Sequence, residues 1–414
     1  MKELARIVQK YGGTSVGTVE RIKHVANRIA ESFTQGNDLV IVVSAMGKST
    51  DTLVEMAQAL TENPNKREMD MLLTTGEQVT IALLTMALLE RGIDAISYTG
   101  WQAGIETDTQ HGNAQIQDIN TTKIEAALHQ NQVVIVAGFQ GISQDSQITT
   151  LGRGGSDTTA VALAAALQAK RCEIYTDVTG VFTTDPRFVK AARKLHSISY
   201  DEMLEMAHLG AGVLHPRAVE FAKNYDVPLV VASSMVEEEG TIIEEVVSVE
   251  KGLVVRGIAF ENDVTKVSVV GLPNEMNTLA RLFSTLSRHF INVDIIVQNE
   301  TDSEHVTISF TVTQSTLTDT ISALEKAQME LNYENIEYES GLAKVSIVGS
   351  GMVSNPGVAA QMFDVLANEA ISIKMVSTSE IKVSTVISED DMVIAVEALH
   401  EAFQLAEEVA HEVL

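Results

Sequence analysis

The sequence predicts a mixed α/β protein in two parts: a large domain whose mostly parallel sheet lies between helices, then two smaller α+β units. Three observations predict this. Strands that are apolar on both faces alternate with helices up to about residue 245, as in parallel sheets. An acidic, glutamate-rich segment at 236–251 ends that alternation. The hexapeptide KVSVVG at 266–271 then returns as KVSIVG at 344–349, 78 residues later, which indicates an internal repeat.

Hydrophobic patterning predicts the elements of the large domain in chain order. Apolar runs rich in β-branched residues predict strands, and longer runs with helical spacing predict helices. The expected order is strand 5–9, helix 19–32, strand 39–45, helix 51–60, a long Met- and Leu-rich helix 69–91, strand 133–139, an Ala-rich helix within 149–170 and strand 172–178.

The repeated hexapeptide opens two similar units. After each copy comes a helix, containing Phe283 or Phe363, and then INVDIIVQ from Ile291 or ISIKMVS from Ile371. Two βαββ-like units explain this spacing. The predicted domains are a large α/β domain at 1–245, a linker and strand contributed to the second part at 246–265, a first repeat at 266–340 and a second repeat at 341–414.

Composition narrows the class of protein. A chain of 414 residues with 45% hydrophobic and 21% charged residues is typical of a folded protein with two or three domains. The net charge of −27, from 29 Lys and Arg against 56 Asp and Glu, disfavours nucleic acid and anionic membranes as partners. Cys172 is the single cysteine, so we expect a core residue, no intrachain disulfide and a reducing compartment. The N-terminus does not resemble a signal peptide, and we expect a cytoplasmic protein.

Two glycine-rich stretches predict anion binding. TTLGRGGSD, from Thr149, sets Arg153 among three glycines at the start of the Ala-rich helix, where free backbone N–H groups attract anions. Ser156 or Asp157 is expected to cap that helix. QKYGGTSVG, from Gln9, sets Lys10 and two glycines between a strand and a helix. An ordinary strand-to-helix turn remains an alternative for this second stretch.

Other motifs are absent or incomplete. MGKST at 46–50 resembles the end of a nucleotide P-loop, but Val42 stands where that motif requires glycine. The chain has no zinc-type Cys and His spacing and no complete G-x-G-x-x-G after a strand.

Together these stretches resemble the aspartokinases of the amino acid kinase family, and the paired C-terminal units resemble ACT regulatory domains. The likeness covers nearly the whole chain. It is carried by KYGGTSVG (10–17), VVSAMGKSTD (42–51), REMDMLLTTGEQ (67–78), YTGWQAG (98–104), HGNA (111–114), VAGFQG (136–141), TTLGRGGSDTTAVALAAAL (149–167) and YTDVTGVFTTDPR (175–187).

The resemblance implies the amino acid kinase fold and ATP-dependent phosphorylation of the β-carboxylate of L-aspartate to 4-phospho-L-aspartate, with Mg²⁺. This would be the first step toward lysine, threonine and methionine. The chemistry suits the residues, because the aspartate side chain is already an anionic nucleophile at neutral pH. Catalysis then rests on holding two anions together and neutralising the charge on the transferring phosphoryl group.

Site residues are carried over by position from the resemblance. Lys10 and Asp157 would be catalytic. Lys10, Gly12 and Gly13 would face the ATP phosphates, with Ser15 assisting. The ATP site would comprise Lys10, Gly12, Gly13, Thr176, Asp177, Phe182, Asp185 and Arg187. The aspartate site would comprise Thr50, Glu77, Arg153, Ser156 and Asp157, with Glu77 toward the amino group and Arg153 toward a carboxylate. Without the family, Glu77 could equally be a helix-surface carboxylate and Asp177 a turn residue.

One position departs from the family pattern. Some members have a lysine before VLHP, where this chain has Gly212. The cationic contact to the nucleotide is then either absent or supplied by Arg187 or Arg217.

The ACT pair implies feedback by an end-product amino acid, lysine alone or with threonine. The expected effector lining is Asn274, Asn292, Asp294, Gln298, Val358, Ala359, Ser372, Ile373 and Ser379. An alternative is that the ACT units serve only as dimerisation surfaces. We expect either a homo-oligomer through the ACT domains or an α2β2 assembly with a regulatory subunit started internally near Val249, with Met235 and Met276 as flanking starts.

Two other functions compete with this one. A kinase for glutamate, acetylglutamate or carbamate is disfavoured by the ACT pair and by the segment 67–78. A catalytically silent amino-acid sensor would be expected to lack Lys10, Glu77 or Arg153, and all three are present.

Overall fold

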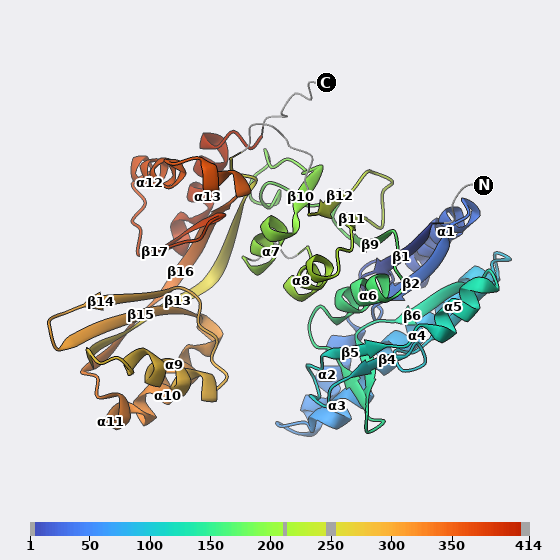
Figure 1. Ribbon diagram of the computed structural model, residues 1–414, viewed down its shortest axis with the longest axis horizontal. Coiled ribbons are helices and arrows are strands. Elements are labelled where there is room, and N and C mark those ends of the chain that lie inside the picture. Colours follow the sequence, from blue (N-terminus) through green and yellow to red (C-terminus); the bar gives the residue numbers. More distant parts are fainter. Residues whose placement is uncertain (1–4, 210–212, 246–253, 407–414) are drawn as a thin grey trace. The chain divides into compact units, whose positions relative to one another are not determined.

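The computed structural model describes residues 5–209, 213–245 and 254–406, and separates into two compact units (Figure 1). The first unit comprises 5–181, 194–208 and 213–245. The second comprises Leu209 and residues 254–406, together with a short segment from the middle of the chain, Phe182–Arg193. Gly212 and Val249, which the sequence analysis singled out, lie outside the described residues.

The main sheet of the first unit is mostly parallel, as predicted. Its eight strands lie in the order β10-β12-β11-β9-β1-β2-β6-β3, and only the β11–β12 pair is antiparallel. The strands are β1 (Arg6–Tyr11), β2 (Asp38–Val43), β3 (Ala95–Tyr98), β6 (Val133–Ala137), β9 (Arg171–Thr176), β10 (Ser197–Ser199), β11 (Leu229–Ser233) and β12 (Thr241–Glu244). Because neighbouring central strands run the same way, their carboxyl ends share one edge of the sheet, where open α/β sheets bind ligands.

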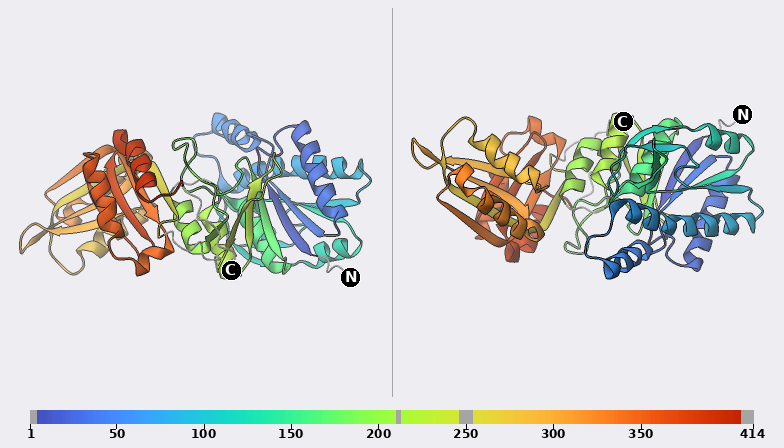
Figure 2. Two further views of the ribbon diagram at one scale, coloured as in Figure 1. Left: turned by 90° about the horizontal axis from the view of Figure 1, so that it is seen from above. Right: turned by 90° about the horizontal axis from the view of Figure 1, so that it is seen from below.

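Helices cover both faces of this sheet (Figure 2). α1 (Val19–Thr34) and α4 (Thr75–Leu89) pack on one face over a core that includes Ile7 and Tyr11 of β1. Since side chains alternate along a strand, Lys10 lies on the opposite face, where α6 (Gly155–Ala166) packs against β1. The other helices are α2 (Ser49–Leu60), α3 (Lys66–Leu73), α5 (Thr122–His129), α7 (Tyr200–His208) and α8 (Pro216–Asn224).

The predicted long helix at 69–91 is two consecutive helices. α3 ends at Leu73 and α4 begins at Thr75. Together they span Lys66–Leu89, 24 residues that by length and composition alone could cross a membrane, a test that core helices of soluble proteins also pass. Asp70 and Glu77 are buried polar residues in this segment.

A small second sheet in the first unit leads the chain to the Ala-rich helix. Its strands lie in the order β5-β4-β7-β8, and β8 is followed directly by the glycine-rich loop that precedes α6. They are β4 (Ile105–Thr107), β5 (Ile116–Ile119), β7 (Gln140–Ser143) and β8 (Ile148–Thr150).

The second unit is built on one six-stranded antiparallel sheet, in the order β14-β15-β13-β16-β18-β17. Each half of the sheet has its own hydrophobic core under its own helices, in agreement with two repeats. The first half contains β13 (Gly257–Pro273), α9 (Thr278–Arg288), β14 (Ile296–Glu300), β15 (His305–Thr313), α10 (Leu317–Lys326) and α11 (Gln328–Leu331). The second half contains β16 (Asn335–Val348), α12 (Val358–Asn368), β17 (Met375–Thr378), β18 (Lys382–Ser388) and α13 (Met392–Ala402). Short 3-10 turns lie at Gln314–Thr316, Ser350–Ser354 and Glu389–Asp391.

The two longest strands, β13 and β16, join the repeats. Ile258 near the start of β13 pairs with Ile347 near the end of β16, and both belong to the core of the second repeat. Further along β13, Val267 pairs with Tyr338 and lies in the core of the first repeat. Each long strand therefore serves both repeats.

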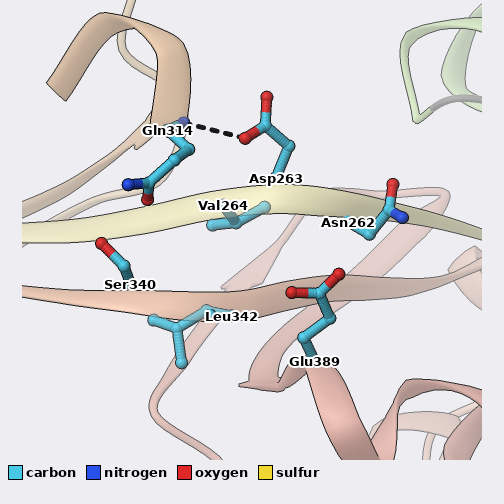
Figure 3. Close-up of a pocket in the computed structure, with 8 residues that line it drawn as sticks. Asn262, Asp263, Val264, Gln314, Ser340, Leu342 and Glu389 are labelled. Carbon is cyan, nitrogen blue, oxygen red and sulfur yellow. Dashed lines mark hydrogen bonds between the residues drawn. The ribbon is translucent and has the colours of Figure 1, made fainter.

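A pocket of about 420 Å³ lies in the second unit where β13 and β16 meet (Figure 3). Most of its lining residues correspond between the two repeats at the spacing of 78 residues. At one side of the pocket, the Gln314 backbone N–H donates a hydrogen bond to the Asp263 carboxylate over 3.1 Å. The lining comprises Asn262, Asp263, Val264, Gln314, Ser340, Gly341, Leu342 and Glu389. It includes none of the residues predicted for catalysis or effector binding.

Candidate active site

Lys10 and Asp157 form the centre of the candidate site. The Lys10 Nζ lies 2.6 Å from the Asp157 Oδ1, and both side chains are about one-eighth exposed. The same Nζ would be 3.4 Å from a Cβ added to Gly12, so the ammonium lies directly beside the first glycine loop. The structure thus brings a cation, a carboxylate and a glycine-rich backbone together at the carboxyl ends of β1 and β9.

The start of α6 differs from the prediction. Neither Ser156 nor Asp157 caps the helix, because the capping position is taken by Gly154 in a left-handed conformation (φ 68°) with no side-chain cap. Both residues lie in the first turn instead, where the Asp157 carboxylate pairs with Lys10 and the Ser156 hydroxyl faces Gly138. Because α6 begins at Gly155, earlier than predicted, neither side chain is at the capping position.

The first glycine loop packs tightly against the segment after β2. A Cβ at Gly13 would lie 2.9 Å from the Ala45 carbonyl oxygen, and the Gly47 N–H donates to the Gly13 carbonyl over 3.0 Å. Only glycine allows this approach. An ordinary strand-to-helix turn would not require it, and the loop is therefore shaped by its neighbours.

Glu77 is buried at the start of α4, and the alternative of a surface carboxylate is wrong. Glu77 is 3% exposed, and the Ala45 backbone N–H donates a hydrogen bond to the Glu77 Oε1 over 3.2 Å. Oε2 is buried without a hydrogen-bond partner of good geometry in the described part of the chain. Burial raises the pKa of Glu77 to about 7, because hydrogen bonding by its own backbone N–H, by the Ala45 N–H and by the Gln140 side chain offsets the desolvation only in part.

Ser234 is a residue that the sequence analysis missed. It is 1% exposed, directly after β11. The Ser15 hydroxyl donates to the Ser234 hydroxyl over 2.7 Å, and the Ser234 hydroxyl and backbone N–H both donate to the Thr176 carbonyl. Ser234 thereby connects the first glycine loop to the predicted nucleotide stretch. Its position at the carboxyl end of a parallel strand was a usable signal.

The remaining predicted aspartate residues are more open. Arg153 is exposed between Gly152 (φ 78°) and Gly154, and Thr50 is half-buried in the first turn of α2. Cys172 is fully buried in β9, as predicted.

The predicted nucleotide residues divide between the two units. Thr176 and Asp177 belong to the first unit, with Asp177 exposed. Phe182, Asp185 and Arg187 belong to the second unit. The Arg187 guanidinium contacts the Asp185 carboxylate at 2.6 Å and, through hydrogen bonding, holds the pKa of that carboxyl below its usual value.

The segment carrying these three residues is built into the second repeat. Val189 lies in the core of that repeat, and the Phe188 ring packs edge-on against Phe260. The Thr183 hydroxyl lies 2.9 Å from the buried His400 Nε2 of α13. Local sequence pattern could not predict this, because every contact is made with residues far along the chain.

Within one chain, the predicted effector lining divides between the two repeats. Gln298 lies in β14 and Ser379 follows β17, and these are the two edge strands of the sheet. The Asp294 carboxylate is already paired, with the buried ammonium of Lys344, which also contacts Glu261 at 2.9 Å. Burial alone would lower the pKa of Lys344, but these two carboxylates outweigh it and raise that pKa.

Comparisons with known proteins agree with this architecture. Residues 5–233 match the amino acid kinase family, and 267–328 and 345–403 match the ACT domain. The chain is therefore an amino acid kinase with a C-terminal ACT pair. It is 66% identical over 400 residues to an aspartokinase of Bacillus sp. (strain MGA3), covering 97% of each chain. It is also 64% identical over 400 residues to aspartokinase 2 of Bacillus subtilis (strain 168), covering 97% of this chain and 98% of the relative. The chain belongs to the aspartokinase family, the kinases that phosphorylate aspartate.

Solved structures give the same result for the fold. Escherichia coli aspartokinase III in complex with aspartate and ADP, in its R-state, is 28% identical with a TM-score of 0.80, covering 96% of this chain and 99% of that one. The T-state of the same enzyme, in complex with lysine and aspartate, has a TM-score of 0.75 at 27% identity over the same shares of the two chains.

Proposed function

We propose that this protein transfers the γ-phosphoryl group of ATP to the β-carboxylate of L-aspartate, giving 4-phospho-L-aspartate, and is inhibited by lysine, alone or together with threonine. The reaction would open lysine, threonine and methionine biosynthesis in the cytoplasm. The observation that carries the proposal is the Lys10 ammonium, held 2.6 Å from Asp157 and beside Gly12. A fixed cation next to a glycine-rich backbone is suited to a transferring phosphoryl group.

The roles of the aspartate residues follow from their surroundings. The substrate carboxylate is already ionised, so the site needs positioning and charge neutralisation rather than a general base. Asp157 would orient Lys10, and Lys10 would neutralise charge on the phosphoryl group. Glu77, with its unpaired Oε2, would accept the substrate ammonium, and the exposed fork of Arg153 would bind a carboxylate. Thr50 and Ser156 would line the same site.

The nucleotide would be held by Gly12 and Gly13 at the phosphates, with Ser15 assisting, and by the stretch that begins at Thr176 and Asp177. Phe182, Asp185 and Arg187, which lie in the segment that packs in the second unit, are also proposed as nucleotide-binding residues. The complex of Escherichia coli aspartokinase III with aspartate and ADP supports ATP as the phosphoryl donor.

Mg²⁺ would accompany ATP and supply further neutralisation of the phosphate charge. Within the described residues, no group of three or more His, Cys, Asp or Glu side chains is arranged to hold a metal ion. The donor set therefore fits an ion held mainly by ATP phosphates and water, as is common for Mg²⁺.

Lysine is the proposed effector because Escherichia coli aspartokinase III has a complex with lysine and aspartate, called its T-state. The proposed lining is the nine residues named from the sequence, four in the first repeat and five in the second. Because Gln298 and Ser379 adjoin opposite edges of the sheet, a second chain would have to bring the two sets together. This supports an oligomer, either of identical chains through the ACT pair or an α2β2 assembly with an internally started subunit.

An ADP-release assay over an acceptor panel tests the proposal. Aspartate should support turnover, and glutamate, acetylglutamate and carbamate should not. Lysine titrated into the aspartate reaction, with and without threonine, should inhibit it. Turnover with aspartate that neither amino acid inhibits would leave the kinase assignment intact and refute the proposed regulation.

A further inference from the structure

The loop that carries Arg153 is held in an unusual conformation. Gly152 and Gly154, on either side of Arg153, have φ of 78° and 68°, a region that favours glycine. A Cβ added at Gly154 would overlap the His215 ring at 2.1 Å, and one at Gly152 would lie 2.9 Å from the Asn113 Oδ1. The direction in which Arg153 leaves the loop is therefore set by neighbouring segments.

Arg217 is the side chain that joins those segments. One guanidinium nitrogen donates to the Leu151 carbonyl over 2.9 Å and another donates to the Ala114 carbonyl over 2.8 Å. The Ala114 N–H in turn donates to the Thr150 carbonyl over 2.8 Å. β8 ends at Thr150, and beyond it the Leu151 N–H donates to the Phe139 carbonyl over 2.8 Å while Arg217 holds the Leu151 carbonyl.

The placement of Arg217 in α8 is unfavourable for the helix itself. It lies in the first turn, directly after Pro216, where the helix dipole disfavours a cation. It is half-buried, and desolvation lowers the pKa of its guanidinium. α8 packs directly on α6, so this turn faces the loop before α6 (Figure 1). The hydrogen bonds from Arg217 to the Leu151 and Ala114 carbonyls offset this unfavourable placement.

We propose that Arg217 is a positioning residue for aspartate: its planar fork bridges the Leu151 and Ala114 carbonyls and thereby fixes the turn from which Arg153 reaches the substrate carboxylate. The inference rests on the proposed role of Arg153. It assigns Arg217 to the acceptor side of the reaction, whereas the sequence had offered Arg217, beside Arg187, as one of two candidate cations for the nucleotide.

The first test compares Arg217→Lys with Arg217→Ala in the full chain. Lysine keeps the charge but lacks the fork, so both variants should raise KM for aspartate by about tenfold to a hundredfold while KM for ATP changes less than about twofold. Lys223→Met, at the far end of α8 in an exposed ion pair with Asp201, is the matched control and should leave both constants unchanged. A rise in KM for ATP alone, or a Lys variant that behaves like the parent protein, overturns the proposal.

The second test is a double-mutant cycle with Arg153→Lys, which separates positioning from a general loss of folding. If Arg217 acts through Arg153, adding Arg217→Lys to Arg153→Lys should raise KM for aspartate by less than about twofold more. If the double variant instead raises KM for aspartate by the product of the two single effects, Arg217 does not act through Arg153. Should Arg153→Lys by itself leave KM for aspartate unchanged, the proposed aspartate site fails. If Arg153→Lys raises KM for aspartate but the Arg217 variants do not, the aspartate site stands and only the role of Arg217 is refuted.

Discussion

Glu77 provides a test in which stability and substrate binding depend on the same proton. Its pKa rises from an ordinary 4.5 to about 7 because the carboxyl is buried, so below pH 4.5 it is protonated in both the folded and the unfolded chain. As the pH rises from 4.5 to about 7, the unfolded chain loses this proton while the folded chain keeps it. The free energy of unfolding therefore falls over this range. At 1.36 kcal/mol for each pH unit, the loss approaches about 3 kcal/mol above pH 7.

The substitution Glu77→Gln removes this dependence. In the absence of aspartate, the variant should keep the stability that the parent protein loses between about pH 5 and pH 7, and above pH 7 it should be the more stable of the two by up to about 3 kcal/mol. Urea unfolding followed by fluorescence of Trp101, the single tryptophan, reports on the first unit. Glu90→Gln, at the exposed end of the same helix, is the control and should not alter the pH profile.

Substrate binding should show the opposite trend with pH. An ionised Glu77 is needed to accept the ammonium of aspartate, so KM for aspartate in the parent protein should fall as the pH rises through about 7. Glu77→Gln should have a high KM that does not follow this profile. A variant that is less stable than the parent protein by the same amount at every pH would refute the reasoning, because Glu77 would then act only as a hydrogen-bonding group.

Four further substitutions test separate parts of the site. Lys10→Ala should lower kcat by about two orders of magnitude or more while the protein stays folded, and near-normal turnover would contradict the central role of this ammonium. Arg153→Lys should raise KM for aspartate much more than KM for ATP, measured by varying each substrate in turn. Ser234→Ala, which removes a hydroxyl shared between the first glycine loop and the nucleotide stretch, should raise KM for ATP severalfold, and an effect on aspartate alone would argue against it. Ser379→Tyr should abolish lysine inhibition with uninhibited turnover and the melting temperature nearly unchanged, because Ser379 lies in an exposed turn; a variant still fully sensitive to lysine would exclude this turn from the effector site.

The sequence predicted the positions of the two glycine-rich loops, each between a strand and a helix, because their cause is local. Glycines at the end of a strand and at the start of an apolar helix indicate close backbone approach wherever they occur. The pairing of Asp157 in α6 was harder to predict, since its partner Lys10 lies in β1, far away along the chain. The family resemblance placed Glu77 in the aspartate site and its helix pattern left a surface position open, but neither predicted that Glu77 is buried.

The difference between local patterns and contacts with distant residues also explains why the predicted nucleotide stretch divides between the two units. Its sequence is continuous from Tyr175 to Arg187, and pattern alone assigns it to one domain. The structure assigns Phe182–Arg193 to the second unit, because Val189 enters the core of the second repeat and Thr183 meets His400. Three of the residues proposed to bind ATP are therefore ordered by packing in the second unit. If these three residues bind ATP as proposed, an effector that changes the packing of this segment would also change ATP binding, because an effector acts only through a state that it binds better.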